Sequence, residues 1–279
     1  MLNDLKMEEY YVAYLDLLGS KKRIEDDDQN NTDKWLRAIK DIYDQTCELI
    51  KIREDYFRNM ESGVSDIPPE YQDRARELVR NMKACPIEIK IFSDNIIFAI
   101  KVPTDAMYKR FNISSLYSIV SHFQALSLCK YHWMLRGGIT CGKLHIEKDY
   151  FIWGKSLIDA HALEGKSGSP PQIRVDDKFV RMHKDLFSND YYKYNFINSP
   201  LSQNEEGIYF VGYETVILDQ SNLFHNDGEQ WLTYFQKTLS EMLKEHESDE
   251  SIIQKVRWAI DYHNKVCTER NADDFKVEG

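Results

Sequence analysis

The sequence predicts an α/β sandwich in which helices cover a mostly antiparallel β-sheet. Two short apolar segments, at residues 10–16 and 87–92, are typical of buried strands. A third strand, at 95–102, begins only two residues after the second, and this spacing predicts a β-hairpin. Between the first strand and the hairpin, apolar residues recur at helical spacing, so the fold combines both kinds of element.

The first strand ends at Leu17-Leu18-Gly19, where glycine permits a tight turn from the strand into a helix. The acidic residues 26–31 predict a solvated loop. A long helix follows from about residue 33, and the segment 65–69, which contains two prolines, breaks it before a second helix ends near residue 82. This helical segment, 33–82, is interpreted as an insertion in the first domain.

Alternating strands and helices continue after the hairpin. We expect a helix at 113–129, a strand at 134–144, a strand or turn at 149–154, a helix at 155–164, a loop at 165–171 and a strand at 171–175. The resulting order of elements fits the sandwich and places one domain at residues 1–185.

Beyond about Lys184 the character of the sequence changes. A strand at 208–211 precedes two helices, at about 228–247 and 251–268. We interpret residues 186–279 as a mostly helical C-terminal extension that packs on the first domain.

The composition narrows the classes of partner. The chain has 279 residues, a net charge of −10, and hydrophobic and charged fractions of 42% and 29%, which are typical of soluble globular proteins. Proteins that grip long nucleic acids usually present a basic face, so we expect no nucleic-acid partner. No apolar run approaches the roughly 20 residues of a membrane span, and the first residues lack a signal-peptide pattern. We therefore expect a cytoplasmic protein with no membrane partner, whose five cysteines are reduced.

Two aspartates stand where the surrounding residues favour the core. Asp16 ends the first strand, and Asp94 lies at the tip of the hairpin. A carboxylate in such a place is costly unless it is paired or binds a metal. Together they suggest one site that holds divalent cations, as in enzymes that handle triphosphates. Two plainer interpretations stay open, because Asp16 could cap the next helix and Asp94 could serve only the turn.

Four short motifs follow one another between residues 10 and 175: Leu15-Asp16-Leu17-Leu18-Gly19, Phe92-Ser93-Asp94-Asn95, Arg136-Gly137-Gly138-Ile139-Thr140-Cys141-Gly142 and Trp153-Gly154-Lys155-Ser156. In these motifs and their order, the chain resembles the class III nucleotidyl (adenylate and guanylate) cyclases. It looks closest to compact bacterial members, such as the pyrimidine (cytidylate and uridylate) cyclases of anti-phage signalling. The resemblance implies a ferredoxin-like, palm-type core.

The resemblance also implies a mechanism. Asp16 and Asp94 would hold two Mg²⁺ or Mn²⁺ ions, with the carbonyl of Leu17 as a further ligand. One ion would activate the ribose 3′-hydroxyl, and the other would steady the triphosphate and the leaving pyrophosphate. The backbone amides that follow Asp16 would face the phosphates. These are the amides of Leu17, Leu18, Gly19 and Ser20. Active sites of this family lie at a homodimer interface, so the chain is expected to self-associate.

The chain departs from the purine-specific members at the base site. Lys90 matches a base-binding lysine of that family, four residues before the second aspartate. Phe151 stands where those members have Asp or Thr, and its ring cannot hydrogen-bond a base edge. A pyrimidine triphosphate, CTP or UTP, is therefore slightly favoured over a purine triphosphate.

Two catalytic positions of the family also differ, because Ile158 and Ala162 stand where Asn and Arg are usual. Arg136 and Lys155 are the first candidates to substitute for them, since both carry charge that suits phosphate. The more distant candidates, all on the helix that begins at Lys155, are Asp159, His161 and Glu164. Arg136 could instead pair with a surface acid, and Lys155 could be merely solvated.

We therefore expect a nucleotide cyclase, a phosphorus–oxygen lyase that forms a 3′,5′-cyclic nucleotide and pyrophosphate from a nucleoside triphosphate. A second-messenger role in anti-phage defence follows from the resemblance alone. Three alternatives stay open: a catalytically degenerate nucleotide-binding sensor, a purine nucleotide cyclase and a palm-type oligonucleotide synthase.

Overall fold

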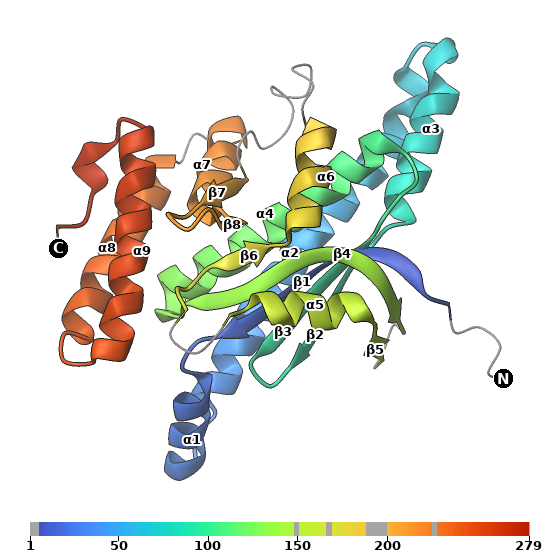
Figure 1. The fold of residues 1–279 in the computed structure, drawn as a ribbon. Coiled ribbons are helices and arrows are strands. Elements are labelled where there is room, and N and C mark those ends of the chain that lie inside the picture. The colour runs from blue at the N-terminus through green and yellow to red at the C-terminus, as the bar shows by residue number, and fades with distance from the viewer. Residues whose placement is uncertain (1–5, 148–150, 166–168, 188–199, 225–227, 279) are drawn as a thin grey trace.

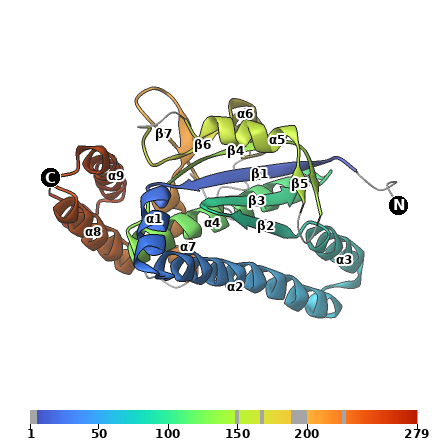
Figure 2. The ribbon, with the colours of Figure 1, turned by 90° about the horizontal axis from the view of Figure 1, so that it is seen from below.

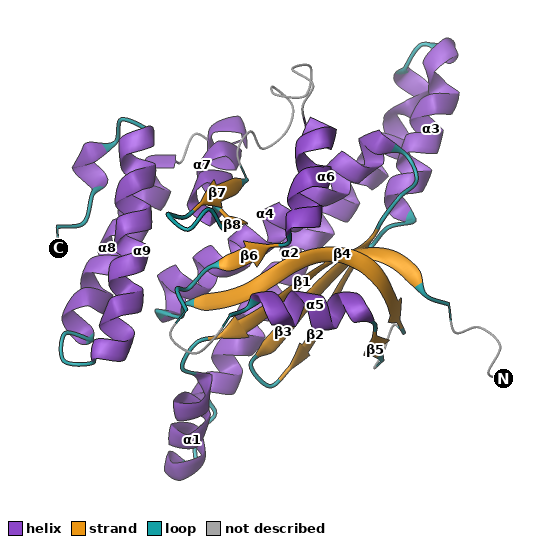
Figure 3. Cartoon of the chain, viewed as in Figure 1, coloured by secondary structure: helices purple, strands orange, loops and turns teal. Residues whose placement is uncertain are grey.

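One sheet runs through the computed structural model, which describes residues 6–147, 151–165, 169–187, 200–224 and 228–278. Its strands are β1 (Glu8–Leu17), β2 (Ile87–Phe92), β3 (Asn95–Lys101), β4 (Leu135–Ile146), β5 (Ile152–Trp153), β6 (Ile173–Val175), β7 (Leu201–Gln203) and β8 (Tyr209–Val211). They lie in the order β2-β3-β1-β4-β6-β8-β7, and β5 pairs with β4. Only β4 and β6 pair in parallel among the described strands. The mostly antiparallel α/β sandwich is thus confirmed (Figure 3).

The described helices cover the two faces of this sheet or pack on other helices. They are α1 (Ser20–Asn30), α2 (Lys34–Ser62), α3 (Pro69–Lys83), α4 (Ala106–Tyr131), α5 (Lys155–Leu163), α6 (Asp177–Phe187), α7 (Tyr213–Phe224), α8 (Gly228–Glu245) and α9 (Glu250–Glu269), with 3₁₀ turns η1 (Gly63–Asp66) and η3 (Asp273–Phe275). Figure 2 shows α2 and α4 on one face and α5 on the other. None of the described helices is both long and apolar enough to cross a lipid bilayer.

Strand β1 separates two cores by the alternation of its side chains. Tyr11, Ala13 and Leu15 are fully buried against α2 and α4, in the largest hydrophobic cluster. Val12 and Tyr14 belong to a smaller cluster on the other face, beneath α5. Because successive strand residues point to opposite faces, Asp16 lies on the α5 face together with Tyr14.

Two adjacent glycines of β4 permit close packing around this face. A Cβ atom on Gly137 would lie 2.1 Å from the carbonyl oxygen of Tyr14, and one on Gly138 would lie 2.2 Å from the carbonyl oxygen of Ala160. Helix α5 therefore rests directly on the backbone of β4. This contact fixes where the C-terminal end of α5 meets the sheet.

The C-terminal part has a core of its own (Figure 1, orange and red). Helices α7, α8 and α9 pack together and against the end of α4, through Ala125 and Leu128. Strands β7 and β8 also follow residue 186, yet they extend the sheet of the first part. The division of the chain at residue 186 stays a prediction.

Several local expectations need correction. Residues 26–31 do not form a loop, because 26–30 continue α1 and Asn31 caps it in the left-handed conformation. This helix is polar and exposed, so it lacks the apolar spacing that reveals a helix in sequence. Helix α4 begins earlier than expected, where the Asp105 side chain accepts a hydrogen bond from the amide of Met107. The expected break at 65–69 and the two-residue hairpin turn are confirmed.

Two further expectations concern thiols and loops. All five cysteines are free, as the sequence predicts. The loop expected at 165–171 and the strand or turn expected at 149–154 each lie partly outside the described residues. Helices α6 and α7 and strand β7 were not expected from the sequence.

Candidate functional site

Asp16 and Arg136 form a cross-strand pair at one end of the sheet. They lie directly opposite each other in the antiparallel pairing of β1 and β4. The Nε atom of Arg136 donates a hydrogen bond of 2.9 Å to Oδ2 of Asp16. The Asp16 and Arg136 side chains are 15% and 21% exposed, so the pair is shielded but reachable. Arg136 therefore pairs with the predicted metal ligand itself.

Asp94 reaches the same place from the tip of the hairpin. Ser93 and Asp94 form the turn between β2 and β3, and Ser93 has a positive φ of 57°. The amide of Leu17 donates to the carbonyl oxygen of Asp94 at 3.1 Å, which joins the tip to the end of β1. Oδ2 of Asp94 accepts a hydrogen bond from the hydroxyl of Ser20 at the start of α1. The two predicted aspartates thus lie at one end of the sheet.

Glu164, at the end of α5, completes this group. Its Oε1 atom lies 2.5 Å from Nη2 of Arg136, and its side chain is only 10% exposed. Its other oxygen, Oε2, lies 3.7 Å from Nε2 of His161. The Arg136 guanidinium therefore bridges Asp16 and Glu164. From sequence Glu164 ranked behind Arg136 and Lys155, because nothing local shows which end of α5 meets the sheet.

Burial, together with neighbouring charges, changes the affinity of these groups for protons. Burial raises the pKa of Asp16, although the hydrogen bond from Arg136 opposes the change. Burial, followed by the charge of Asp16, raises the pKa of Glu164. Burial also raises the pKa of Tyr14 to about 12, with a further contribution from Glu164. Three carboxylates with one adjacent guanidinium make a place that favours an additional cation.

The turn after Asp16 partly contradicts its expected role. Gly19 has a positive φ of 78°, so a tight turn into α1 is confirmed. The amide of Leu17 is taken by Asp94, however, and the amide of Leu18 donates to the carbonyl oxygen of Met134 at 3.0 Å. These two amides therefore do not face a phosphate, and only those of Gly19 and Ser20 remain as candidates.

Lys155 does not join the aspartates within one chain. It is the first residue of α5, and its Nζ atom pairs at 2.6 Å with Asp159 one turn later. Its side chain is 80% exposed. At about 1.5 Å per residue, nine residues of helix separate it from Glu164 by about 13 Å. The sequence predicted a role for the start of α5, but the end of the helix meets Asp16.

Lys90 and Phe151 lie together at a second place on the same face. Nζ of Lys90 donates to the carbonyl oxygen of Glu147 at 2.9 Å, and the amide of Glu147 donates to the carbonyl oxygen of Phe151 at 2.7 Å. Lys90 of β2 pairs with Ile97 of β3, which pairs with Tyr14 of β1, so one intervening strand and two residues along the sheet separate Lys90 from Asp16. The structure thus brings the two predicted base-site residues together, but away from Asp16.

The donors at the sheet end fit a small divalent cation. Carboxylate oxygens are the ligands that Mg²⁺ and Mn²⁺ prefer, and Asp16 and Asp94 supply them from adjacent strand ends. Among the described residues, no three side chains of His, Cys, Asp or Glu converge as around a metal ion. The expected site needs two carboxylates and the carbonyl of Leu17. One carboxylate is already engaged by Arg136, and an ion would have to compete for it.

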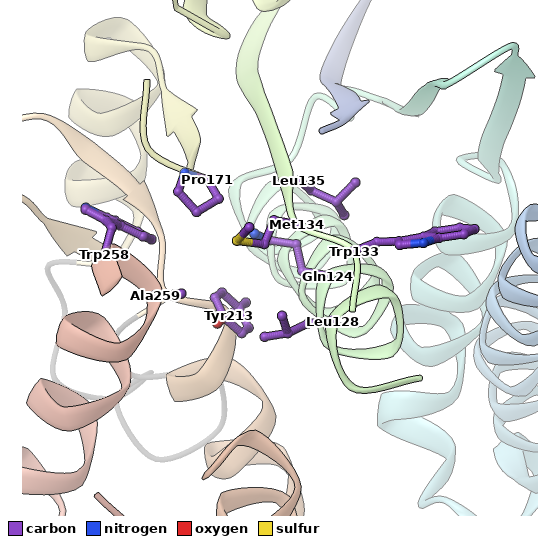
Figure 4. A pocket seen from close by; sticks show the side chains of 9 residues that line it. All are labelled: Gln124, Leu128, Trp133, Met134, Leu135, Pro171, Tyr213, Trp258 and Ala259. Carbon is purple, nitrogen blue, oxygen red and sulfur yellow. The ribbon is translucent and has the colours of Figure 1, made fainter. Parts of the chain in front are cut away.

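The cavity shown in Figure 4 belongs to a different place. It measures about 20 Å³, lies between the end of α4 and the C-terminal helices, and holds at most one water. Its lining is mostly apolar and includes Met134, Tyr213 and Trp258. Oε1 of Gln124, which borders it, is buried and has no hydrogen-bond partner. The cavity is not a substrate site, and the acidic end of the sheet is the candidate.

No protein-family model matches the chain, and a search of the curated proteins finds no match.

Proposed function

We propose that the chain is a metal-dependent nucleotide cyclase that forms a 3′,5′-cyclic nucleotide and pyrophosphate from a nucleoside triphosphate. The observation that carries this proposal is the meeting of Asp16 and Asp94 at one end of the sheet, joined by the hydrogen bond from Leu17 to Asp94. A strand end and a hairpin tip with one carboxylate each are the arrangement that the four motifs imply.

In this proposal each side chain has a defined task. Asp16, Asp94 and the carbonyl of Leu17 would hold two Mg²⁺ or Mn²⁺ ions, and such ions would supply activation of the ribose 3′-hydroxyl and neutralisation of the triphosphate charge. Arg136 bridges Asp16 and Glu164 beside them, so the donors that these two carboxylates leave over are the ones that would reach phosphate oxygens. Burial beneath α5 shields these groups from water and strengthens their electrostatic interactions.

A second copy of the chain completes the site in this proposal. Lys90 and Phe151 lie close to each other, but both are separated from Asp16 and Asp94. One chain therefore presents two separate halves of a site. Three large apolar side chains from just before β5 to α5 are exposed: Phe151 by 44%, Trp153 by 63% and Ile158 by 68%. A homodimer would cover them and bring Lys90 of one protomer to the aspartates of its partner.

The finer parts of the proposal concern substrate and setting. Phe151 offers no polar atom to a base edge, which supports a pyrimidine triphosphate, CTP or UTP, over a purine triphosphate. The acidic balance of the chain, −10, supports a small nucleotide over a nucleic acid. A cytoplasmic second-messenger synthase of anti-phage defence is the setting that the resemblance implies.

The test is incubation of the purified protein with ATP, GTP, CTP or UTP and Mn²⁺, followed by mass spectrometry of the products. We expect a cyclic monophosphate from at least one triphosphate, lost in Asp16→Ala and Asp94→Ala. Asp159→Ala is the matched control, because it removes an exposed carboxylate from α5. Full activity in either aspartate variant, or no product from any triphosphate, would contradict the proposal.

The second candidate is a degenerate cyclase that binds a nucleotide without turnover. Ile158 is exposed on α5 and Ala162 is apolar, so neither supplies the amide or guanidinium usual at these positions. This candidate predicts saturable binding of a nucleoside triphosphate with product below one equivalent per chain.

A further inference from the structure

The Arg136 guanidinium divides its hydrogen bonds between two carboxylates on different elements. Its Nε atom contacts Asp16 of β1 at 2.9 Å, and its Nη2 atom contacts Glu164 of α5 at 2.5 Å. All three side chains are at least three-quarters buried, at 21%, 15% and 10% exposed. The guanidinium fork is planar and rigid, so it can keep one partner while it releases the other.

A divalent cation between Asp16 and Asp94 alters this balance. The ion and the guanidinium carry charges of the same sign, and both use the carboxylate of Asp16. Arg136 and the ion therefore compete for the carboxylate of Asp16. Without Glu164, the loss of Asp16 to the ion would leave the mostly buried charge of Arg136 without a carboxylate partner, which is strongly unfavourable. Glu164 removes that penalty because it remains bound to Arg136.

We propose that Glu164 is a positioning residue that retains the Arg136 guanidinium while Asp16 is released to a divalent cation. Arg136 then competes with the cation for Asp16, and Glu164 sets the strength of that competition. This inference rests on the proposed function, since it needs a cation at Asp16 and Asp94. It adds to that function a residue outside the four motifs, and it predicts cation affinity whether or not a product forms.

Mn²⁺ binding tests the inference without measuring activity. Free Mn²⁺ is quantified by electron paramagnetic resonance in titrations of the wild type, Arg136→Met, Glu164→Gln and the double variant. We expect Arg136→Met to tighten Mn²⁺ binding about tenfold and Glu164→Gln to weaken it about fivefold, since contacting residues couple on this scale. In the Arg136→Met background, Glu164→Gln should change the affinity less than about twofold, because its partner is gone.

Asp159→Asn is the matched control for charge. It removes one carboxylate from the same helix, but Asp159 pairs with exposed Lys155 and does not contact Arg136 in the described interactions. Its effect on Mn²⁺ affinity should be small and equal in both backgrounds. If Arg136→Met fails to fold, as judged by thermal unfolding, Arg136→Gln replaces it in the same cycle.

The outcomes separate the two proposals. If the wild type binds Mn²⁺, Asp16→Ala abolishes binding, and Glu164→Gln has no effect or the same effect in both backgrounds, the inference is overturned and the metal site stands. A shift in melting temperature with unchanged Mn²⁺ affinity would assign Glu164 a merely structural role, which also overturns it. Absence of Mn²⁺ binding by the wild type would overturn both proposals.

Discussion

Two buried acid–base clusters of this chain differ in their access to solvent. The cluster at the end of the sheet, Asp16–Arg136–Glu164, keeps between 10% and 21% of each side chain exposed. The pair Glu214–His263, between α7 and α9, has 0% exposed on both sides, with Nδ1 of His263 and Oε2 of Glu214 only 2.7 Å apart. Charge that a ligand can reach is available for binding, whereas the Glu214–His263 pair is closed to any ligand.

The sealed pair is also fully satisfied. Nε2 of His263 lies 2.9 Å from the carbonyl oxygen of Phe275, so both ring nitrogens face acceptors, as suits a ring with two protons. Glu214 further accepts a hydrogen bond from the Tyr213 hydroxyl at 3.1 Å. Cys267 lies 3.5 Å from the same ring, but burial raises the pKa of its thiol to about 11. This group resembles a nucleophilic triad in composition, yet it is closed to substrate and its thiol stays protonated.

The largest expected effect is on the sealed pair. Glu214→Ala leaves the His263 ring buried without its counter-charge, so we expect the free energy of unfolding to fall by about 3–5 kcal/mol. Glu269→Ala is the control, because it removes an exposed carboxylate from α9, the helix that carries His263, and should cost less than about 1 kcal/mol. Urea denaturation measures both. Equal costs would show that the sealed Glu214–His263 pair contributes no more to stability than an exposed ion pair.

The next effect concerns how α5 presents Glu164. Gly138→Ala places a Cβ atom 2.2 Å from the carbonyl oxygen of Ala160, so α5 has to shift. We expect a loss of about 1–3 kcal/mol in stability, together with altered Mn²⁺ affinity. Gly142→Ala on the same strand meets only the Cβ atom of Ser156 at 3.4 Å and should be tolerated. Identical thermal unfolding of the two variants would refute close packing as the cause.

The pH dependence of stability separates the clusters. Hydrogen bonding and charge from Glu214 outweigh burial and raise the pKa of His263, so its stabilisation is complete below the ordinary value of 6.5 and is lost as pH rises through the raised pKa. The pKa values of Asp16 and Glu164 are also raised, so their contribution to stability is likewise lost as pH rises. This loss begins near the ordinary carboxyl values of 3.8 and 4.5.

Melting temperatures from pH 4 to pH 9 check this separation. His263→Asn should remove the step that begins above pH 6.5, and Glu164→Gln should change only the acidic one. A single step shared by both variants would mean that the two clusters do not titrate independently.

The smallest expected effect is at Lys155. Its ion pair with Asp159 is exposed, so Lys155→Ala should change stability by no more than about 0.5 kcal/mol. Mn²⁺ affinity should equal that of the wild type, in contrast to Arg136→Met. Loss of Mn²⁺ binding in Lys155→Ala would show that the start of α5 is part of the site.

The elements that carry their own local signal were predictable. The hairpin at Ser93-Asp94 follows from two apolar strands and a two-residue turn, and the break at 65–69 follows from its prolines. The second half of α1, residues 26–30, was predicted as a loop because it is polar and mostly exposed, so nothing in its residues shows a buried side. Signals of this kind act over a few neighbouring residues, so they can be recognised without knowledge of the tertiary structure.

From the sequence alone it could be predicted that Asp16 ends a strand, that Asp94 lies at a hairpin tip, and that Arg136 stands in a glycine-rich strand. Which end of α5 reaches the site depends on tertiary packing, because the close approach of Gly138 to Ala160 sets the position of that helix. The tertiary structure placed Glu164 on Arg136, left Lys155 in solvent and put Lys90 with Phe151 away from the aspartates. These relations join residues that are distant in the chain, and the packing of whole elements creates them.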